Sequence, residues 1–160
     1  MENCLKVGIL GAGNIAGSMA EALNELQKEG KACAYAVASR SQEKALEFAR
    51  KWNITRAYSS YEELASDPEV DLIYIATPHS LHYEQAKLCM EHGKNVLVEK
   101  AFTANARQAE ELFAMAEEKK VFITEAIWTR YMPSREIITG LLREGAVGTP
   151  PVSYTHLRAH

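Results

Sequence analysis

The stretch Val7-Gly8-Ile9-Leu10-Gly11-Ala12-Gly13-Asn14-Ile15-Ala16-Gly17 decides how this chain is expected to fold. It carries the spacing G-x-G-x-x-G/A, which joins a strand to a helix and brings backbone N–H groups against a pyrophosphate. Gly11 permits the tight turn, Gly13 lets the backbone approach the phosphates, and Ala16 keeps the helix close to the strand. The pattern alone also fits a glycine-containing turn that binds nothing.

The residues on either side of this turn favour a ligand site. Before it, apolar residues alternate as in a strand: Leu5, Val7 and Ile9. After it, apolar residues recur at helical spacing: Ile15, Met19, Ala22 and Leu26. A strand, a glycine turn and a helix in this order predict a dinucleotide site. The expected cofactor-binding residues in the turn are Gly11, Ala12, Gly13, Asn14 and Ile15.

The composition sets limits on the class of protein. The 160 residues suit one globular domain, and the net charge of −3 gives no basic field for nucleic acid or an anionic membrane. No signal peptide or membrane-spanning run is read in the sequence, so we expect a cytoplasmic protein. Cys4, Cys33 and Cys89 form no C-x-x-C pair. With two in expected strands and one in an expected helix, they read as buried, reduced thiols.

Apolar periodicity and turn residues predict a strict alternation of strands and helices. We expect strands near 4–10, 33–39, 55–58, 71–76, 94–99 and 121–125. We expect helices near 14–28, 42–52, 60–66, 80–92, 105–119 and 133–144, with capping signals at Ser60-x-x-Glu63 and Asn105-x-x-Gln108. Continuously apolar strands between helices are typical of a parallel sheet covered on both faces. The predicted fold class is therefore α/β, a doubly wound parallel-sheet Rossmann domain.

The end of the second strand indicates which dinucleotide is preferred. An NAD enzyme would place an acid there for the ribose 2′-hydroxyl, but this chain has Ser39 and Arg40, and the next carboxylate is Glu43. A hydroxyl and a guanidinium suit a 2′-phosphate, so the sequence predicts NADP, with NAD possible. The alternative is that Ser39 or Ser41 caps the next helix and that Arg40 is a solvated surface charge.

Two further loops fall at the edge of the sheet where ligands bind. Thr77-Pro78-His79-x-x-His82 follows the fourth strand, and Glu99-Lys100 follows the fifth. The two histidines could ligate a metal, but no carboxylate or cysteine cluster accompanies them, so no metal site is expected. The ammonium of Lys100 could donate to a carbonyl or hydroxyl beside the nicotinamide. The alternatives for Lys100 are a salt bridge with Glu99 or a solvated strand end.

The connection after the sixth strand is dense in aromatic and charged residues. It reads Glu125-Ala126-Ile127-Trp128-Thr129-Arg130-Tyr131-Met132-Pro133. Taken alone, this segment fits a ligand-binding loop and core packing equally well.

Together these motifs resemble the glucose-fructose oxidoreductase and inositol dehydrogenase (Gfo/Idh/MocA) family. Within this family they are most similar to the dihydrodiol dehydrogenases and the NADP-dependent D-xylose dehydrogenases. The resemblance covers about residues 4–148. It depends on the glycine turn, Ala38-Ser39-Arg40, Tyr61-Glu62-Glu63-Leu64, Thr77-Pro78-His79-x-x-His82, Glu99-Lys100 and Glu125-Ala126-Ile127-Trp128-Thr129-Arg130. It implies that Lys100 is the catalytic lysine near the nicotinamide and substrate. It also implies that these residues border the cofactor: Thr77, Pro78, His79, His82, Glu99, Trp128 and Arg130.

The chain departs from the family pattern in two ways. Ala101 stands where the family has a proline, often after a cis peptide bond, and a cis bond before another residue costs about 3 kcal/mol. Family members also carry a second α/β domain that covers the nicotinamide. We therefore expect a dinucleotide-binding domain over 1–125, a connecting segment and helix over 126–148, and a non-native tail over 149–160. On this interpretation the chain is truncated before the second domain.

These observations predict the NADP-binding portion of an oxidoreductase. The full-length protein would transfer a hydride between a nicotinamide cofactor and a CH–OH group of a sugar or cyclic diol, as a homo-oligomer, while this chain alone would be inactive. The alternative is a non-catalytic NAD(P)-binding or sensor module. A methyltransferase-like domain is disfavoured, because such domains place an acid at the end of the second strand.

Overall fold

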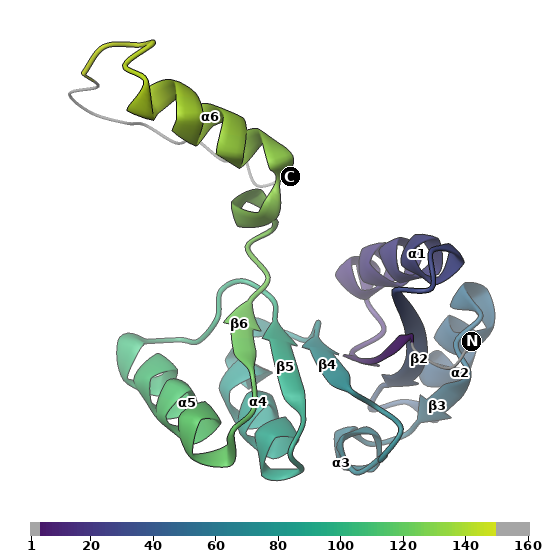
Figure 1. The fold of residues 1–160 in the computed structure, drawn as a ribbon. Helices are drawn as coiled ribbons and strands as arrows, with labels where there is room; N and C mark the ends of the chain where they lie inside the picture. Colours follow the sequence, from purple (N-terminus) through teal and green to yellow (C-terminus); the bar gives the residue numbers. More distant parts are fainter. Residues whose placement is uncertain (1–3, 150–160) are drawn as a thin grey trace. The chain divides into compact units, whose positions relative to one another are not determined.

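The computed structural model describes residues 4–149 and contains a six-stranded, entirely parallel sheet in the order β3-β2-β1-β4-β5-β6 (Figure 1). The strands are β1 (Leu5–Leu10), β2 (Ala32–Ala38), β3 (Arg56–Tyr58), β4 (Leu72–Ile75), β5 (Asn95–Val98) and β6 (Ile123–Glu125). The α-helices are α1 (Asn14–Lys28), α2 (Gln42–Trp52), α3 (Tyr61–Ala65), α4 (His82–Glu91), α5 (Ala106–Lys119) and α6 (Pro133–Arg143). The predicted doubly wound fold and every predicted element are present, with ends that differ by at most two residues.

Two hydrophobic cores lie on opposite faces of the sheet, because successive side chains of a strand point to opposite sides. On β1, Ile9 belongs to the core under α1 and α2, whereas Leu10 belongs to the core under α3, α4 and α5. On β4, Tyr74 and Ile75 divide in the same way. Both faces are thus buried, which explains why these strands have almost no polar residues.

The first helix buries a different face from the one its apolar spacing suggested. Ile15 and Leu26 are exposed, and the buried positions are those with mainly small side chains: Ala16, Gly17, Ala20 and Leu23. Small residues let the helix axis approach the sheet closely, so burial follows side-chain size here rather than hydrophobicity. The predicted packing role of Ala16 agrees with its complete burial.

The helix starts are capped mainly as the sequence indicated. Ser60 and Glu63 form a full capping box at α3. Asn105 accepts a hydrogen bond from the N–H of Gln108 at α5. Ser41 accepts one from the N–H of Lys44, so it is Ser41 that caps α2. Two 3₁₀ turns, His79–Leu81 and Trp128–Tyr131, were not predicted.

The thiols differ from their prediction in part. Cys4 precedes β1 and, like Cys33, is half-buried, whereas Cys89 on α4 is fully buried. All three are free. Cys4 lies outside the first strand because the ladder with β2 begins at Leu5.

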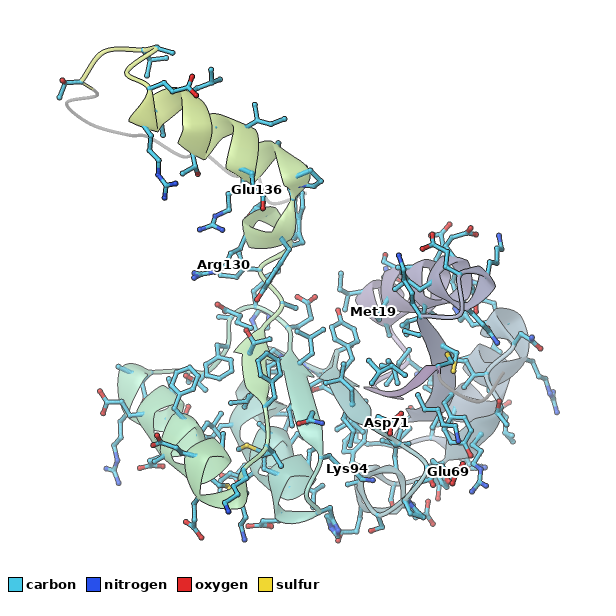
Figure 2. The ribbon with its side chains drawn as sticks, viewed as in Figure 1. Met19, Glu69, Asp71, Lys94, Arg130 and Glu136 are labelled. Atoms are coloured by element: carbon cyan, nitrogen blue, oxygen red, sulfur yellow. The ribbon has the colours of Figure 1, made fainter. Side chains whose placement is uncertain are left out.

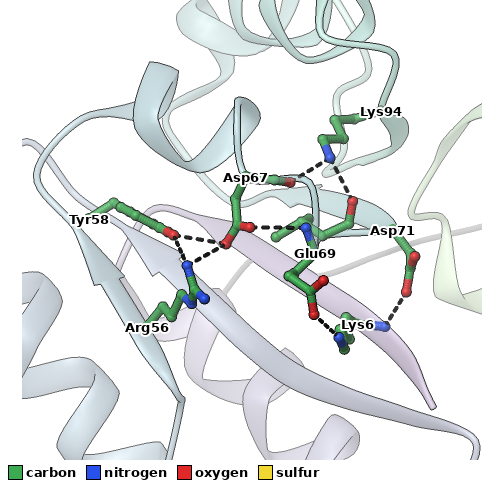
Figure 3. A network of polar contacts seen from close by, with 8 residues as sticks. Lys6, Arg56, Tyr58, Asp67, Glu69, Asp71 and Lys94 are labelled. Carbon is green, nitrogen blue, oxygen red and sulfur yellow. Dashed lines mark hydrogen bonds and ion pairs between the residues drawn. The ribbon is translucent and has the colours of Figure 1, made fainter. Parts of the chain in front are cut away.

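A polar network at the amino-terminal edge of the sheet holds the segment before β4 (Figure 3). The buried ammonium of Lys94 donates to the carbonyl oxygens of Asp67 and Val70 at 2.5 and 2.9 Å. The Asp67 carboxylate accepts from the Tyr58 hydroxyl at 2.8 Å and from the Glu69 N–H at 3.0 Å. Burial alone would raise the pKa of Asp67, but these hydrogen bonds outweigh it and lower the pKa. This edge is therefore structural.

The chain divides into two units between Ala126 and Ile127. The second unit contains the second 3₁₀ turn and α6, whose apolar side chains are exposed. Of the tail predicted over 149–160, all but Thr149 lies outside the described residues. No helix within residues 4–149 is long and apolar enough to cross a membrane.

Candidate functional site

The carboxyl ends of β1 and β4 mark the point where the strand order reverses. β1 pairs with β2 on one side and with β4 on the other, so the chain after β1 and the chain after β4 leave in opposite directions. In open α/β sheets such a switch point leaves a crevice that binds ligands. The predicted site residues up to Lys100 all follow the carboxyl ends of strands or begin the next helix.

Gly11 is required by both conformation and space. Its φ of +102° is one that residues with a Cβ rarely adopt. A Cβ there would lie 2.8 Å from the carbonyl oxygen of Ala76 and 3.3 Å from Cγ2 of Thr77. The Gly11 N–H also donates to the carbonyl of Ala38 at 2.9 Å. The turn is thereby fixed between the ends of β2 and β4.

Gly13 faces open space at the start of α1. A Cβ at this position would have no atom within 4 Å, and no side chain caps the helix N-terminus. A hollow of about 270 Å³ opens beside the turn and reaches Trp52, whose ring lies 3.2 Å from where a Cβ of Gly17 would be. Free N–H groups at an uncapped helix start form an anion site, so this turn fits a pyrophosphate.

Ser39 and Arg40 continue the same edge beyond β2. Ser39 is half-buried, and its Oγ accepts from the Ser41 N–H at 3.4 Å. Arg40 is exposed and makes no hydrogen bond or ion pair with any other residue of the described chain. Because Ser41 provides the helix cap, the hydroxyl of Ser39 and the guanidinium of Arg40 are free to meet a phosphate.

The loop after β4 is held by buried polar contacts. The hydroxyl of Thr77 donates to Oε1 of Gln85 at 2.5 Å, and both side chains are buried. The ring of His82 is completely buried, with Nε2 at 3.0 Å from the carbonyl oxygen of Thr77. Pro78 and His79 are exposed on this loop, and the ring of His79 meets that of His82 edge-on. His82 thus supports the loop from beneath rather than presenting its nitrogens to solvent.

Glu99 orients the residue that follows it. Its Oε1 accepts from the hydroxyl of Tyr74 at 2.6 Å, and its Oε2 accepts from the backbone N–H of Lys100 at 3.0 Å. Burial and the neighbouring Glu99 raise the pKa of Tyr74 far above its usual value. The salt bridge considered between Glu99 and the Lys100 ammonium is not formed, because the carboxylate turns inward. Lys100 is exposed, and its ammonium has no partner among residues 4–149.

The turn after Lys100 is held from two further elements. The Lys100–Ala101 peptide bond is cis, although Ala101 stands where the family has a proline. Nδ1 of His82 lies 2.9 Å from the carbonyl oxygen of Ala101, and Oε1 of Glu125 accepts from the N–H of Phe102 at 2.7 Å. Sequence reasoning did not find the supporting roles of Tyr74, Gln85 and Glu125, since these contacts join loops far apart in the chain.

The described contacts therefore connect several of the predicted site residues of the first unit in one line, whereas Arg40 makes none of these contacts. The line runs along the carboxyl edge from Ser39 and the glycine turn through Thr77 and His82 to Lys100. Trp128 and Arg130 belong to the second unit and are exposed. Figure 2 labels Arg130 in that unit. Their place beside a cofactor stays a prediction. No group of three or more His, Cys, Asp or Glu side chains in residues 4–149 could hold a metal ion.

Comparison with known proteins agrees with this geometry. The family model Gfo/Idh/MocA, described as an oxidoreductase family with an NAD-binding Rossmann fold, matches residues 5–126. Trans-1,2-dihydrobenzene-1,2-diol dehydrogenase from Xenopus tropicalis is 43% identical over 143 residues, which cover 89% of this chain and 43% of that protein. D-xylose 1-dehydrogenase (NADP(+)) from Hypocrea jecorina is 40% identical over 154 residues, or 91% of this chain and 39% of that protein.

A solved structure shows the same fold with a cofactor. KijD10, a 3-ketoreductase from Actinomadura kijaniata in complex with NADP, superposes with a TM-score of 0.82 at 32% identity, covering 91% of this chain and 46% of that one. The chain thus spans about two fifths of the length of its curated relatives. With the match over 5–126 and the switch-point geometry, this chain belongs to the Gfo/Idh/MocA family of oxidoreductases, as its NAD-binding Rossmann domain.

Proposed function

We propose that this chain is the NADP(H)-binding part of an oxidoreductase acting on a CH–OH group of a sugar or a cyclic diol. The observation that carries the proposal is the line of contacts that joins the end of β2, the glycine turn and the Lys100 turn along one sheet edge, with Arg40 two residues after β2. NADP(H), when bound, accepts or supplies the hydride. The relatives named for dihydrodiol and D-xylose substrates support this substrate class.

The residues along that edge would bind different parts of the cofactor and the substrate. The N–H groups at Gly13 and the start of α1 would bind the pyrophosphate, and Arg40 with Ser39 would bind the 2′-phosphate. The ammonium of Lys100 would donate a hydrogen bond to the oxygen on the reacting carbon and stabilise negative charge that develops there. Tyr74, through Glu99, would keep the Lys100 backbone in place.

The longer protein would add what one Rossmann domain lacks. A second domain is expected to exclude water from the reacting carbon, and general acid–base catalysis is worth about 10²- to 10⁴-fold. We therefore propose that the 160-residue chain binds NADPH but turns over little substrate. Assembly of the longer protein as a homo-oligomer and its location in the cytoplasm are also predictions.

The binding proposal is tested by titrating the 160-residue chain with NADPH while following tryptophan fluorescence. Trp52 lies against Gly17 beside the turn and should report the ligand. Saturable binding of NADPH, and none of adenosylmethionine, is expected. Binding of adenosylmethionine without NADPH would show instead a methyltransferase-like domain.

The catalytic proposal is tested in a longer form that includes the second domain. Lys100→Ala should abolish turnover while NADPH still binds, because the exposed ammonium supports no other residue of the described chain. Lys119→Ala, a change at another exposed lysine, is the matched control. Full turnover by Lys100→Ala would favour the non-catalytic binding module.

A further inference from the structure

His82 lies between two loops that both reach the candidate site. Its ring is completely buried at the start of α4. Nε2 lies 3.0 Å from the carbonyl oxygen of Thr77, after β4, and Nδ1 lies 2.9 Å from that of Ala101, after β5. The imidazole therefore links the two loops through both of its nitrogens.

The chemistry of the two partners decides the state of the ring. A backbone carbonyl oxygen can only accept a hydrogen bond, and a neutral imidazole carries one N–H. A neutral ring would therefore point a nitrogen lone pair at one of the two carbonyl oxygens at about 3 Å, with no water to separate them. An imidazolium has two N–H groups and donates to both.

The groups around His82 hold the backbone of the same turn. Glu99 binds the N–H of Lys100, His82 faces the carbonyl of Ala101, and Glu125 binds the N–H of Phe102. Three consecutive residues are thus held by side chains from three elements. The ionisable groups that contact the ring or the turn it faces are His79, Glu99 and Glu125, and Lys100 lies on the turn itself.

Two carboxyl side chains bind the backbone on either side of Ala101. Glu99 is 9% exposed and Glu125 is half-buried, and both accept from the backbone on either side of Ala101. The backbone is therefore held by a side-chain acceptor both before and after the carbonyl that His82 faces.

We propose that His82 is a positioning residue that works as an imidazolium, bridging the carbonyls of Thr77 and Ala101 and so fixing the turn that carries Lys100. The protonation state follows from the two contacts alone. The role toward Lys100 rests on the proposed function. A neutral His82 keeps only one of the two hydrogen bonds, and the loops after β4 and β5 then separate as independent segments.

The decisive measurement is the ¹⁵N NMR signal of the His82 ring in the 160-residue chain at pH 7.5. Two protonated nitrogens, both shielded from solvent exchange, are expected. One protonated and one bare nitrogen would overturn the proposal. The signals are assigned by their absence in His82→Gln, or by contacts to Thr77 if that variant does not fold. His92→Gln, at the exposed end of α4, should leave both signals in place.

A kinetic measurement separates this proposal from the proposed function. In a longer, active form, His82→Gln should lower kcat by roughly ten- to a hundredfold, because a misplaced catalytic group loses rate. The comparison is made at saturating NADPH, because the family resemblance also implies that His82 borders the cofactor. An unchanged kcat would overturn the positioning role while leaving NADPH binding in force. A wild-type chain that fails to bind NADPH would overturn the proposed function, and the NMR result would still decide the state of His82.

Discussion

The hydroxyl of Tyr74 donates a hydrogen bond of 2.6 Å to Oε1 of Glu99, and both side chains are buried between neighbouring strands. This contact joins the core of the sheet to the Lys100 turn, because the other oxygen of Glu99 binds the Lys100 N–H. The sheet interior therefore sets the direction in which the candidate catalytic residue leaves β5.

Tyr74→Phe should lower the free energy of unfolding by about 1–3 kcal/mol, because it leaves a buried carboxylate oxygen without its donor. Urea denaturation measures the change. Tyr61→Phe is the control, since the half-buried Tyr61 makes no hydrogen bond through its hydroxyl within the described residues, and it should stay within about 0.5 kcal/mol. Equal losses in the two variants would show that the Tyr74 contact does not stabilise the fold.

Gly11 and Gly13 should separate folding from binding. Gly11→Ala forces a Cβ to 2.8 Å from the Ala76 carbonyl at a φ of +102°, and strain of this kind costs about 1–3 kcal/mol or more. Gly13→Ala meets no atom within 4 Å and should change stability by less than about 1 kcal/mol.

Gly11→Ala is the variant expected to lose stability, whereas Gly13→Ala is the variant expected to lose NADPH binding. The methyl of Gly13→Ala occupies the open space where a pyrophosphate would approach, so binding should be lost from a folded chain. Circular dichroism and fluorescence titration measure both properties. If Gly13→Ala binds NADPH as the wild type does, the phosphates do not lie at this turn.

Lys94→Met should destabilise the chain without affecting binding. The change leaves the carbonyls of Asp67 and Val70 without a donor in a buried place, at a cost of about 1–3 kcal/mol. Lys94 and its two acceptors precede β5 and β4, at the amino-terminal edge of the sheet (Figure 3), so the NADPH dissociation constant should not change. Lys119→Met, on an exposed position of α5, is the control for removing a lysine charge. A weakened NADPH affinity in folded Lys94→Met would contradict the separation of the two edges.

Cys89 should make the chain less stable in alkali. Burial raises the pKa of its thiol from 9.0 to about 12 in the folded state. Between these values the unfolded chain loses a proton that the folded chain keeps, so this contribution to stability is complete below pH 9 and falls as the pH rises. The slope is about 1.4 kcal/mol per pH unit for one group.

The pH dependence is measured by urea denaturation between pH 8 and pH 11. Cys89→Ala should flatten the slope by that amount, whatever its effect on stability at pH 8. The same slope in Cys89→Ala and the wild type would show that this thiol is not protected.

The order of elements could be predicted because its signals are local. The glycine turn, the apolar strands and the capping pair Ser60 and Glu63 each involve residues within a few positions of one another. The buried face of α1 could not be predicted from the sequence, because close packing of the helix against the sheet buries Ala16 and Ala20 and leaves Ile15 exposed.

The contacts that hold the candidate site residues in place could not be predicted from the sequence either. His82 meets Ala101 and Tyr74 meets Glu99 only after β4 and β5 pair in register. No periodicity in the chain encodes which loops become neighbours at a sheet edge. The candidate residues were therefore found from their positions after strands, and the residues that hold them were found only in the folded chain.

We propose that the carboxyl edge of this sheet binds NADP(H) through Arg40. Parallel titration of the wild-type chain and of Arg40→Ala with NADPH and NADH tests this proposal most directly. A hydrogen bond to a charged group contributes about 1.5–3 kcal/mol. The account predicts that NADPH binds the wild type roughly ten- to a hundredfold more tightly than NADH, and that Arg40→Ala removes the difference by weakening NADPH alone. Equal affinities of the wild-type chain for the two cofactors would contradict it.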